Sequence, residues 1–179
     1  MINETFYRLR MIVLIAVMTG MRIAEIFALK WSDLLYKEEL IAVRSKLKRG
    51  KVRYVPMFAE LANELRKYPA VIGEERIFPG QAGAKGERQR VDKSFETILR
   101  MADIKNFRFH DLRHTFASWY TMNGGDLYEL AKILGHANIK MTQRYAKLAK
   151  NHIARTGNTA REMWRLMEGE AGSKAELGS

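Results

Sequence analysis

One stretch of the chain combines the pattern of a packed helix with several ionisable side chains: His110-Asp111-Leu112-Arg113-His114-Thr115-Phe116-Ala117-Ser118. It begins a predicted helix over residues 110–122. Helices are also expected at 127–134 and at about 139–147, and segments containing glycine separate the three. The second half of the chain is therefore predicted to be mainly helical.

The first half is predicted to begin with helices. The apolar run over residues 5–18 predicts a buried helix, and Thr19-Gly20 separates it from a second helix at about 21–29. Trp31-Ser32-Asp33 closes this unit. Two more helices are predicted, at 58–67 and 91–101.

Two runs rich in β-branched residues, Leu40–Arg44 and Lys51–Val55, flank the turn signal Lys48-Arg49-Gly50 and predict a β-hairpin that Pro56 ends. A short extended piece is expected at 76–78, and a mobile, solvated loop at 79–90. The fold class predicted is α+β, mostly α, with a small antiparallel hairpin or sheet on one edge. The chain has no internal repeat.

Length, charge and cysteine content limit the possible functions. The chain has 179 residues, a formal net charge of +11 and no cysteine, so disulfide scaffolds and thiolate zinc ribbons are excluded. The longest apolar run, Met11 to Met18, is too short for a membrane-spanning helix, and the N-terminus does not resemble a signal peptide. A soluble intracellular protein is expected. The basic excess favours a nucleic-acid partner, although a solvated basic surface would have the same composition.

The pair His110 and His114 has the i, i+4 spacing of a zinc-protease helix, but the residue after the first histidine is Asp111 rather than the glutamate such sites use as a base. Arg113 shares a face with His110 and would repel a divalent ion. No metal is expected. Taken alone, each histidine is better explained as a packing residue with a satisfied ring nitrogen.

An imidazole beside a permanently charged bidentate donor is typical of a phosphate site. Arg22 follows Thr19-Gly20 at a predicted helix start, where free amides also favour anions, and Glu25 can orient its guanidinium. Taken singly, each candidate has an ordinary interpretation. Arg22 and Glu25 would be an exposed ion pair, Lys48 a charged turn, His136 a cap, and Tyr145 a core-edge residue.

Taken together and in order, five segments spanning about residues 5–148 resemble the catalytic domain of tyrosine recombinases, the phage-integrase family. The segments are Thr19-Gly20-Met21-Arg22-Ile23-Ala24-Glu25-Ile26 with Leu29-Lys30-Trp31-Ser32-Asp33, Lys48-Arg49-Gly50-Lys51-Val52-Arg53-Tyr54-Val55-Pro56, His110 to Ser118, Leu134-Gly135-His136, and Thr142-Gln143-Arg144-Tyr145-Ala146.

This resemblance implies a role for each matching residue. Tyr145 would attack a DNA phosphate to form a 3′-phosphotyrosyl link and free a 5′-hydroxyl. Arg22 and Arg113 would clamp the non-bridging oxygens, with His136 as a third donor. Lys48 would protonate the leaving 5′-oxygen, with Lys46 or Lys51 in its place if the hairpin register differs, and His110 would help to move the tyrosine proton. Supporting and DNA-binding positions are also expected: Glu25 and His114 as supports, and Arg44, Lys46, Arg49, Lys51, Arg53 and Arg144 as DNA contacts.

The resemblance also implies a partner and an assembly: duplex DNA, cut and rejoined without metal or ATP by a homotetramer that is a monomer off DNA. The expected domains are a catalytic domain at 1–150, an amphipathic tail helix at 151–169 and a disordered end at 170–179, and the family's N-terminal DNA-clamping domain is expected to be absent. Trp164, Met163 and Met167 are candidate tail anchors, docking on a neighbouring protomer or back on their own.

The function expected is therefore a site-specific recombinase or integrase of a phage or mobile element, in the cytoplasm of a prokaryotic cell and associated with the nucleoid. Two alternatives remain at this point. One is a type IB topoisomerase-like enzyme that relaxes DNA, and the other is a catalytically silent DNA-binding regulator of the same fold.

Overall fold

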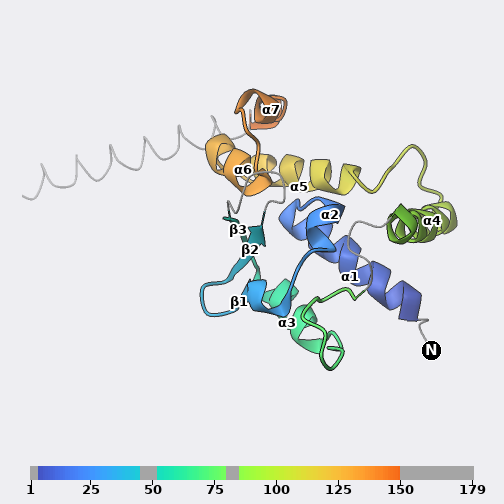
Figure 1. The fold of residues 1–179 in the computed structure, drawn as a ribbon. Coiled ribbons are helices and arrows are strands. Elements are labelled where there is room, and N and C mark those ends of the chain that lie inside the picture. The colour runs from blue at the N-terminus through green and yellow to red at the C-terminus, as the bar shows by residue number, and fades with distance from the viewer. Residues whose placement is uncertain (1–3, 45–51, 80–84, 150–179) are drawn as a thin grey trace, which may run out of the picture.

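The structure is a computed structural model that describes residues 4–44, 52–79 and 85–149. Helices dominate it, and one small antiparallel sheet lies beside them (Figure 1). Within the described ranges, no helix is long and apolar enough to cross a membrane. The elements are α1 (Glu4–Thr19), α2 (Ile23–Ile26), η1 (Trp31–Asp33), β1 (Leu34–Leu35), β2 (Leu40–Arg44), β3 (Val52–Pro56), α3 (Ala59–Lys67), α4 (Lys85–Met101), α5 (Asp111–Met122), α6 (Leu127–Leu134), α7 (Lys140–Gln143) and η2 (Ala146–Ala149).

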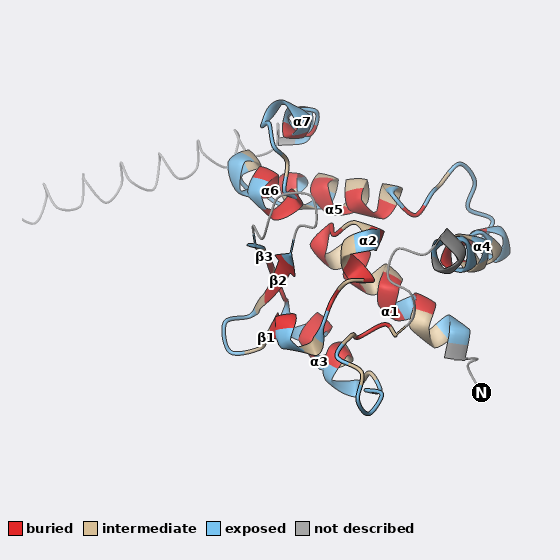
Figure 2. Cartoon of the chain, viewed as in Figure 1, coloured by how far each residue is buried: buried red, intermediate tan, exposed pale blue. Residues whose placement is uncertain are grey.

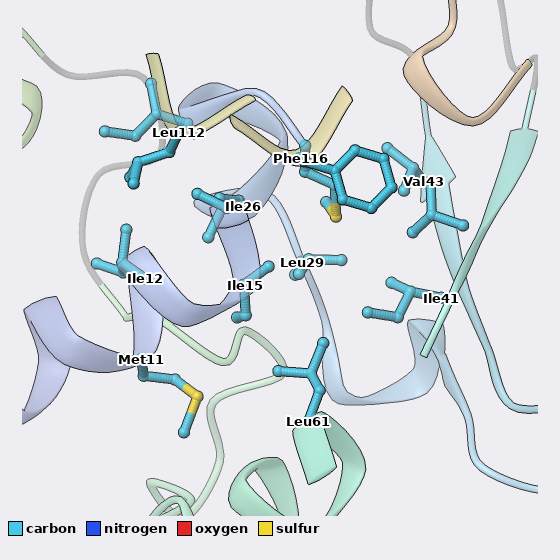
Figure 3. Close-up of a cluster of buried hydrophobic side chains, with 14 of the residues drawn as sticks. Met11, Ile12, Ile15, Ile26, Leu29, Ile41, Val43, Leu61, Leu112 and Phe116 are labelled. Atoms are coloured by element: carbon cyan, nitrogen blue, oxygen red, sulfur yellow. The ribbon is translucent and has the colours of Figure 1, made fainter. Parts of the chain in front are cut away.

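Helix α1 is the central element, and it packs against α2, α3, α4 and α5. Its residues Met11, Ile12 and Ile15 are fully buried, as expected for a helix that is apolar on all sides. Figure 3 shows these side chains in one cluster with Ile26 of α2 and Phe116 of α5. The buried residues of α1 and α5 therefore form a continuous core between the helices and the sheet (Figure 2).

The sheet has the order β1-β2-β3, with both pairs antiparallel. Strand β2 pairs with β3 from Leu40 opposite Pro56 to Arg44 opposite Val52. Ile41 and Val43 of β2 contribute to the core shown in Figure 3, while α6 packs against β3. The sheet therefore packs against the core that includes α1 and also against α6, which follows α5 in the chain.

The structure confirms the predicted α+β class, and the helices predicted at 5–18, 58–67, 110–122 and 127–134 are present within a residue or two. Strand β1 is an addition, and only residues 23–26 of the expected second helix are α-helical. The helix expected at 139–147 divides into α7 and η2.

One local prediction was wrong: residues 85–90, expected in a loop, form the first turns of α4. The glycine at position 86 suggested a break, but one glycine costs a helix only about 1 kcal/mol. The surrounding Lys, Glu, Arg and Gln residues favour a helix, and Arg88 Nε bonds Asp92 Oδ2 one turn later at 2.9 Å. The rest of the expected loop, 80–84, lies outside the described residues.

Candidate active site

Arg22 precedes α2, where the chain turns after α1. The backbone N–H of Arg22 donates to Glu25 Oε2 at 2.8 Å, and its Nη1 donates to Glu25 Oε1 at 3.3 Å. Arg22 donates both bonds, which hold its backbone and its guanidinium beside the Glu25 carboxylate at the start of the short helix. Burial would raise the pKa of Glu25, but the hydrogen bond and charge of Arg53, followed by those of Arg22, lower it overall. Glu25 is therefore an anion at neutral pH.

Arg113, on the first turn of α5, is a buried cation with 4% of its surface exposed. Its Nη1 donates to the Gly20 carbonyl and its Nη2 to the Leu134 carbonyl, both at 2.6 Å. Burial lowers the pKa of Arg113 to about 10, with a further lowering by the charge of Arg22, so it stays protonated at pH 7. A guanidinium has five N–H donors, so three remain after these two bonds.

Arg22, His110 and Arg113 line one pocket of about 170 Å³, together with Arg88 of α4. Among the described residues that line it there is no carboxylate. Desolvation lowers the pKa of His110, and electrostatic interactions with nearby His114, Arg113 and Arg22 lower it further. Cations that repel one another around a small pocket form a site for a polyanionic group such as a phosphate.

Tyr145 follows α7, and its side chain is buried, with 6% of its surface exposed. Its hydroxyl is 2.5 Å from His114 Nδ1, on the second turn of α5. Burial raises the pKa of the Tyr145 phenol, and the charges of Arg144 and Arg113 oppose this rise. His114 in turn makes an edge contact with His110, with ring centroids 5.2 Å apart. The histidine pair therefore connects Tyr145 to the residues that line the pocket.

His136 follows the left-handed Gly135 that ends α6, where φ is +66°. Its Nδ1 lies 2.8 Å from the hydroxyl of Thr142, which is fully buried. Burial lowers the pKa of His136 to about 4, and the charges of Arg113 and Arg22 contribute. The ring is therefore neutral at pH 7. Its Nδ1 is used by Thr142, which leaves Nε2 for a ligand.

The residues predicted to contact DNA have different positions. Arg44, mostly exposed, pairs with Asp33 at 2.9 Å, and Arg144 is exposed. Arg53 instead directs its guanidinium to Glu25 and to the Ile133 carbonyl. Four predicted residues lie outside the described residues, as do the tail anchors: Lys46, Lys48, Arg49 and Lys51, then Met163, Trp164 and Met167.

The structure brings together the predicted residues Arg22, His110 and Arg113 around one pocket. Glu25 contacts Arg22, and His114 contacts both His110 and Tyr145. Sequence reasoning missed Arg88, because residues 85–90 were expected to form a loop. It also assigned the tyrosine proton to His110, whereas in the structure His114 contacts the Tyr145 hydroxyl. The i, i+4 spacing of the two histidines was the available signal, but spacing alone does not show which of them meets a residue 31 positions further on.

Comparisons with known proteins show which sequences and folds this chain resembles. The tyrosine recombinase XerC of Xanthomonas campestris pv. campestris (strain B100) is 33% identical over 146 residues, which are 79% of this chain and 45% of that protein. This chain therefore spans less than half the length of that relative. The solved catalytic domain of bacteriophage HP1 integrase superposes with a TM-score of 0.63 at 31% identity, covering 88% of this chain and 92% of that one.

A second solved structure, the XerH site-specific recombinase bound to a palindromic difH substrate after cleavage, superposes with a TM-score of 0.70 at 25% identity. The match covers 88% of this chain and 47% of that one. The model of the phage integrase family matches residues 2–152, which include the whole pocket, His136 and Tyr145. Because that match extends over most of the sequence, this chain belongs to the phage integrase family.

Proposed function

We propose that this chain is the catalytic part of a site-specific DNA recombinase, an integrase that cleaves and rejoins duplex DNA through a 3′-phosphotyrosyl intermediate. The observation that carries the proposal is the pocket lined by Arg22, His110 and Arg113, with the Tyr145 hydroxyl held by the adjacent His114. The XerH structure, by its description, holds a recombinase on its DNA substrate after cleavage, and it has the same fold.

In the proposed step, the Tyr145 oxygen attacks the scissile phosphorus and the bond from phosphorus to the 5′-oxygen breaks. The phenol proton passes to His114 Nδ1, and the 5′-oxygen takes a proton from Lys48, the predicted lysine of the hairpin. A phenol of pKa about 10 is only about one part in a thousand ionised at pH 7, a deficit of roughly 4 kcal/mol. Transfer of the proton to His114 and the nearby cation Arg113 offset this cost.

Arg22 and Arg113 stabilise the charge that develops on the non-bridging oxygens, and His136 adds a donor through Nε2. Removing one well-placed donor of this kind typically slows a reaction about 10²- to 10³-fold. Guanidinium groups supply the positive charge that a metal ion supplies in other nucleases, so the proposed step proceeds without metal. The phosphotyrosine stores the energy of the broken bond, so rejoining needs no ATP.

The test is a covalent-capture assay. The chain is incubated in EDTA with a random pool of nicked duplexes, whose short cleaved strand diffuses away, and the products are separated on a denaturing gel. We expect a protein–DNA band that is absent in Tyr145→Phe and retained in Tyr128→Phe, which changes an exposed tyrosine on α6. A band that persists in Tyr145→Phe contradicts the assigned nucleophile.

The proposed partners follow from the same function. The chain is proposed to bind duplex DNA in the cytoplasm of a prokaryotic cell, near the nucleoid, and to act as a tetramer that forms on DNA from monomers. We also propose that the C-terminal tail docks on a neighbouring protomer. Deleting residues 152–179 would then remove the higher assemblies seen by sedimentation on DNA, and their persistence would contradict tail exchange. A requirement for two recombination sites separates this function from that of a DNA-relaxing enzyme.

A further inference from the structure

Arg53 is the second residue of β3, and its side chain is directed into the protein and is only 17% exposed. Its three nitrogens all have protein partners. Nη1 and Nη2 each donate to one oxygen of Glu25 at 2.8 Å, and Nε donates to the Ile133 carbonyl at 2.9 Å. This is the bidentate geometry that a guanidinium makes with a carboxylate, extended by a third bond to a backbone oxygen.

The two bonds from Arg53 to Glu25 connect Arg53 to Arg22. Each Glu25 oxygen is shared: Oε1 accepts from the side chains of Arg53 and Arg22, and Oε2 from Arg53 and the Arg22 backbone N–H. Glu25 is 15% exposed, so without Arg53 a mostly desolvated carboxylate would lose its strongest partner and its fixed orientation. The position of the Arg22 guanidinium at the pocket depends on that carboxylate.

The bond from Arg53 Nε to the Ile133 carbonyl connects Arg53 to the segment that precedes His136. The Ile133 and Leu134 carbonyls belong to the last turn of α6, where helical partners are lacking. Arg53 binds the first of these carbonyls and Arg113 the second. A Cβ built on Gly135 would lie 3.1 Å from Arg53 Cδ and Nε, so the arginine also packs closely on the turn that leads to His136.

From these contacts we propose that Arg53 is a positioning residue that couples three parts of the active site: Arg22 through Glu25, His136 through the end of α6, and the hairpin strand on which it lies. It acts through protein contacts and not as a phosphate contact, which is the role that the sequence suggested. This inference rests on the proposed recombinase function, because its principal readout is DNA cleavage.

The variant Arg53→Lys distinguishes the two roles, because lysine keeps the charge but cannot span two carboxylate oxygens and a carbonyl. We expect the single-turnover rate of adduct formation at saturating DNA to fall at least 10-fold, while the dissociation constant for DNA changes less than 3-fold. A lysine that retains wild-type cleavage would overturn the proposal. Arg66→Lys, on the exposed surface of α3, is the matched control.

The salt dependence of DNA binding provides a second test that distinguishes a positioning role of Arg53 from a phosphate contact. Loss of one phosphate contact reduces the slope of log K against log salt concentration by about 0.9. We expect Arg53→Gln to leave this slope unchanged. A reduction by about one would show that Arg53 contacts DNA and would overturn the proposal.

A double-mutant cycle with Glu25→Gln distinguishes positioning of the active site through Glu25 from a contribution to folding stability alone. If Arg53 acts through Glu25, the rate loss of the double variant is clearly smaller than the product of the two single losses. Losses that multiply would contradict coupling. Urea unfolding of each variant shows which variants are folded at the assay temperature. If Arg53→Lys is unfolded, Glu25→Gln alone tests the same contact. We then expect Glu25→Gln to slow cleavage because the carboxylate positions Arg22, and wild-type cleavage by this variant would overturn the proposal.

Failure of the proposed function is distinguishable from failure of this inference. If the wild-type chain forms no adduct, the recombinase function is contradicted, and Arg53 is then tested in the DNA-free protein by NMR. The Arg22 guanidinium and His136 ring signals shift in Arg53→Lys if Arg53 positions them. If both sets of signals are unchanged, the positioning role is wrong whatever the reaction.

Discussion

Among single residues, His136 shows how the DNA-free site is prepared for an anion. Burial and the nearby arginines lower its pKa to about 4, against about 6.5 for a free histidine. Between these two values the unfolded chain binds more protons than the folded one. The stabilisation contributed by neutral His136 is therefore complete above about pH 6.5 and is lost as the pH falls toward 4.

The prediction is that the free energy of unfolding drops more between pH 7 and pH 5 in the wild type than in His136→Gln, measured by urea unfolding. Equal drops in both proteins would show that His136 does not titrate as described. A DNA phosphate at the pocket should oppose the nearby positive charges and raise the His136 pKa. An NMR titration of the ring with and without bound DNA should show this rise.

The residue types of the site were predictable from the sequence, but several contacts were not. The order of the five segments selected Arg22, His110 and Arg113, and the structure places all three around one pocket. The contact of His114 with Tyr145 and the inward direction of Arg53 depend on residues 31 and 28 positions away. Such contacts are set by how α5, α7 and β3 pack, and no local pattern encodes them.

Among the elements, the junction of α1 and α2 sets the geometry of the pocket. Gly20 has φ of +65°, and a Cβ there would lie 2.6 Å from a Phe116 ring carbon and 2.8 Å from Leu134 Cδ2. Its carbonyl also accepts from Arg113. The turn therefore joins α1, α5 and α6 at one point, and glycine is required both for its backbone conformation and for the close packing.

We predict that Gly20→Ala lowers the free energy of unfolding by about 2–4 kcal/mol, from backbone strain and overpacking together. Gly73→Ala is the matched control, because Gly73 has φ of +81° but an added Cβ meets nothing within 4 Å. It should cost only about 1 kcal/mol. Chemical denaturation measures both, and similar losses would show that the contacts with Phe116 and Leu134 yield easily.

Helices with strong apolar patterns, such as α1 and α6, were predictable because burial of their apolar side chains determines them. The start of α4 and the two-residue strand β1 were not. Helix α4 begins in a polar sequence where propensity and one ion pair compete with a glycine, and β1 exists only because Leu34 and Leu35 pair with β2. Tertiary pairing, absent from local sequence, determines such elements.

For the whole molecule, the net charge of +11 describes an attraction to polyanions without showing where they bind. The pocket is a place where part of that positive charge is concentrated, because Arg88 of α4 lines it beside Arg22 and Arg113. Arg88 is held by Asp92 through Nε, so its terminal nitrogens can still donate to a ligand. A DNA strand whose phosphate occupies the pocket would pass within reach of α4.

Arg88→Ala should therefore weaken DNA binding and reduce the slope of log K against log salt concentration by about 0.9, the value for one lost phosphate contact. Arg66→Ala, which removes the same charge from the surface of α3, should change the slope much less, because its guanidinium lies over the Tyr36 ring, with Cζ 4.6 Å from the centroid. Fluorescence anisotropy with a labelled duplex between 50 and 200 mM salt measures both, roughly the range over which such contacts are resolved. If the two variants change the slope equally, the attraction is spread over the surface. A change confined to Arg88→Ala shows that the DNA path runs along α4 to the pocket.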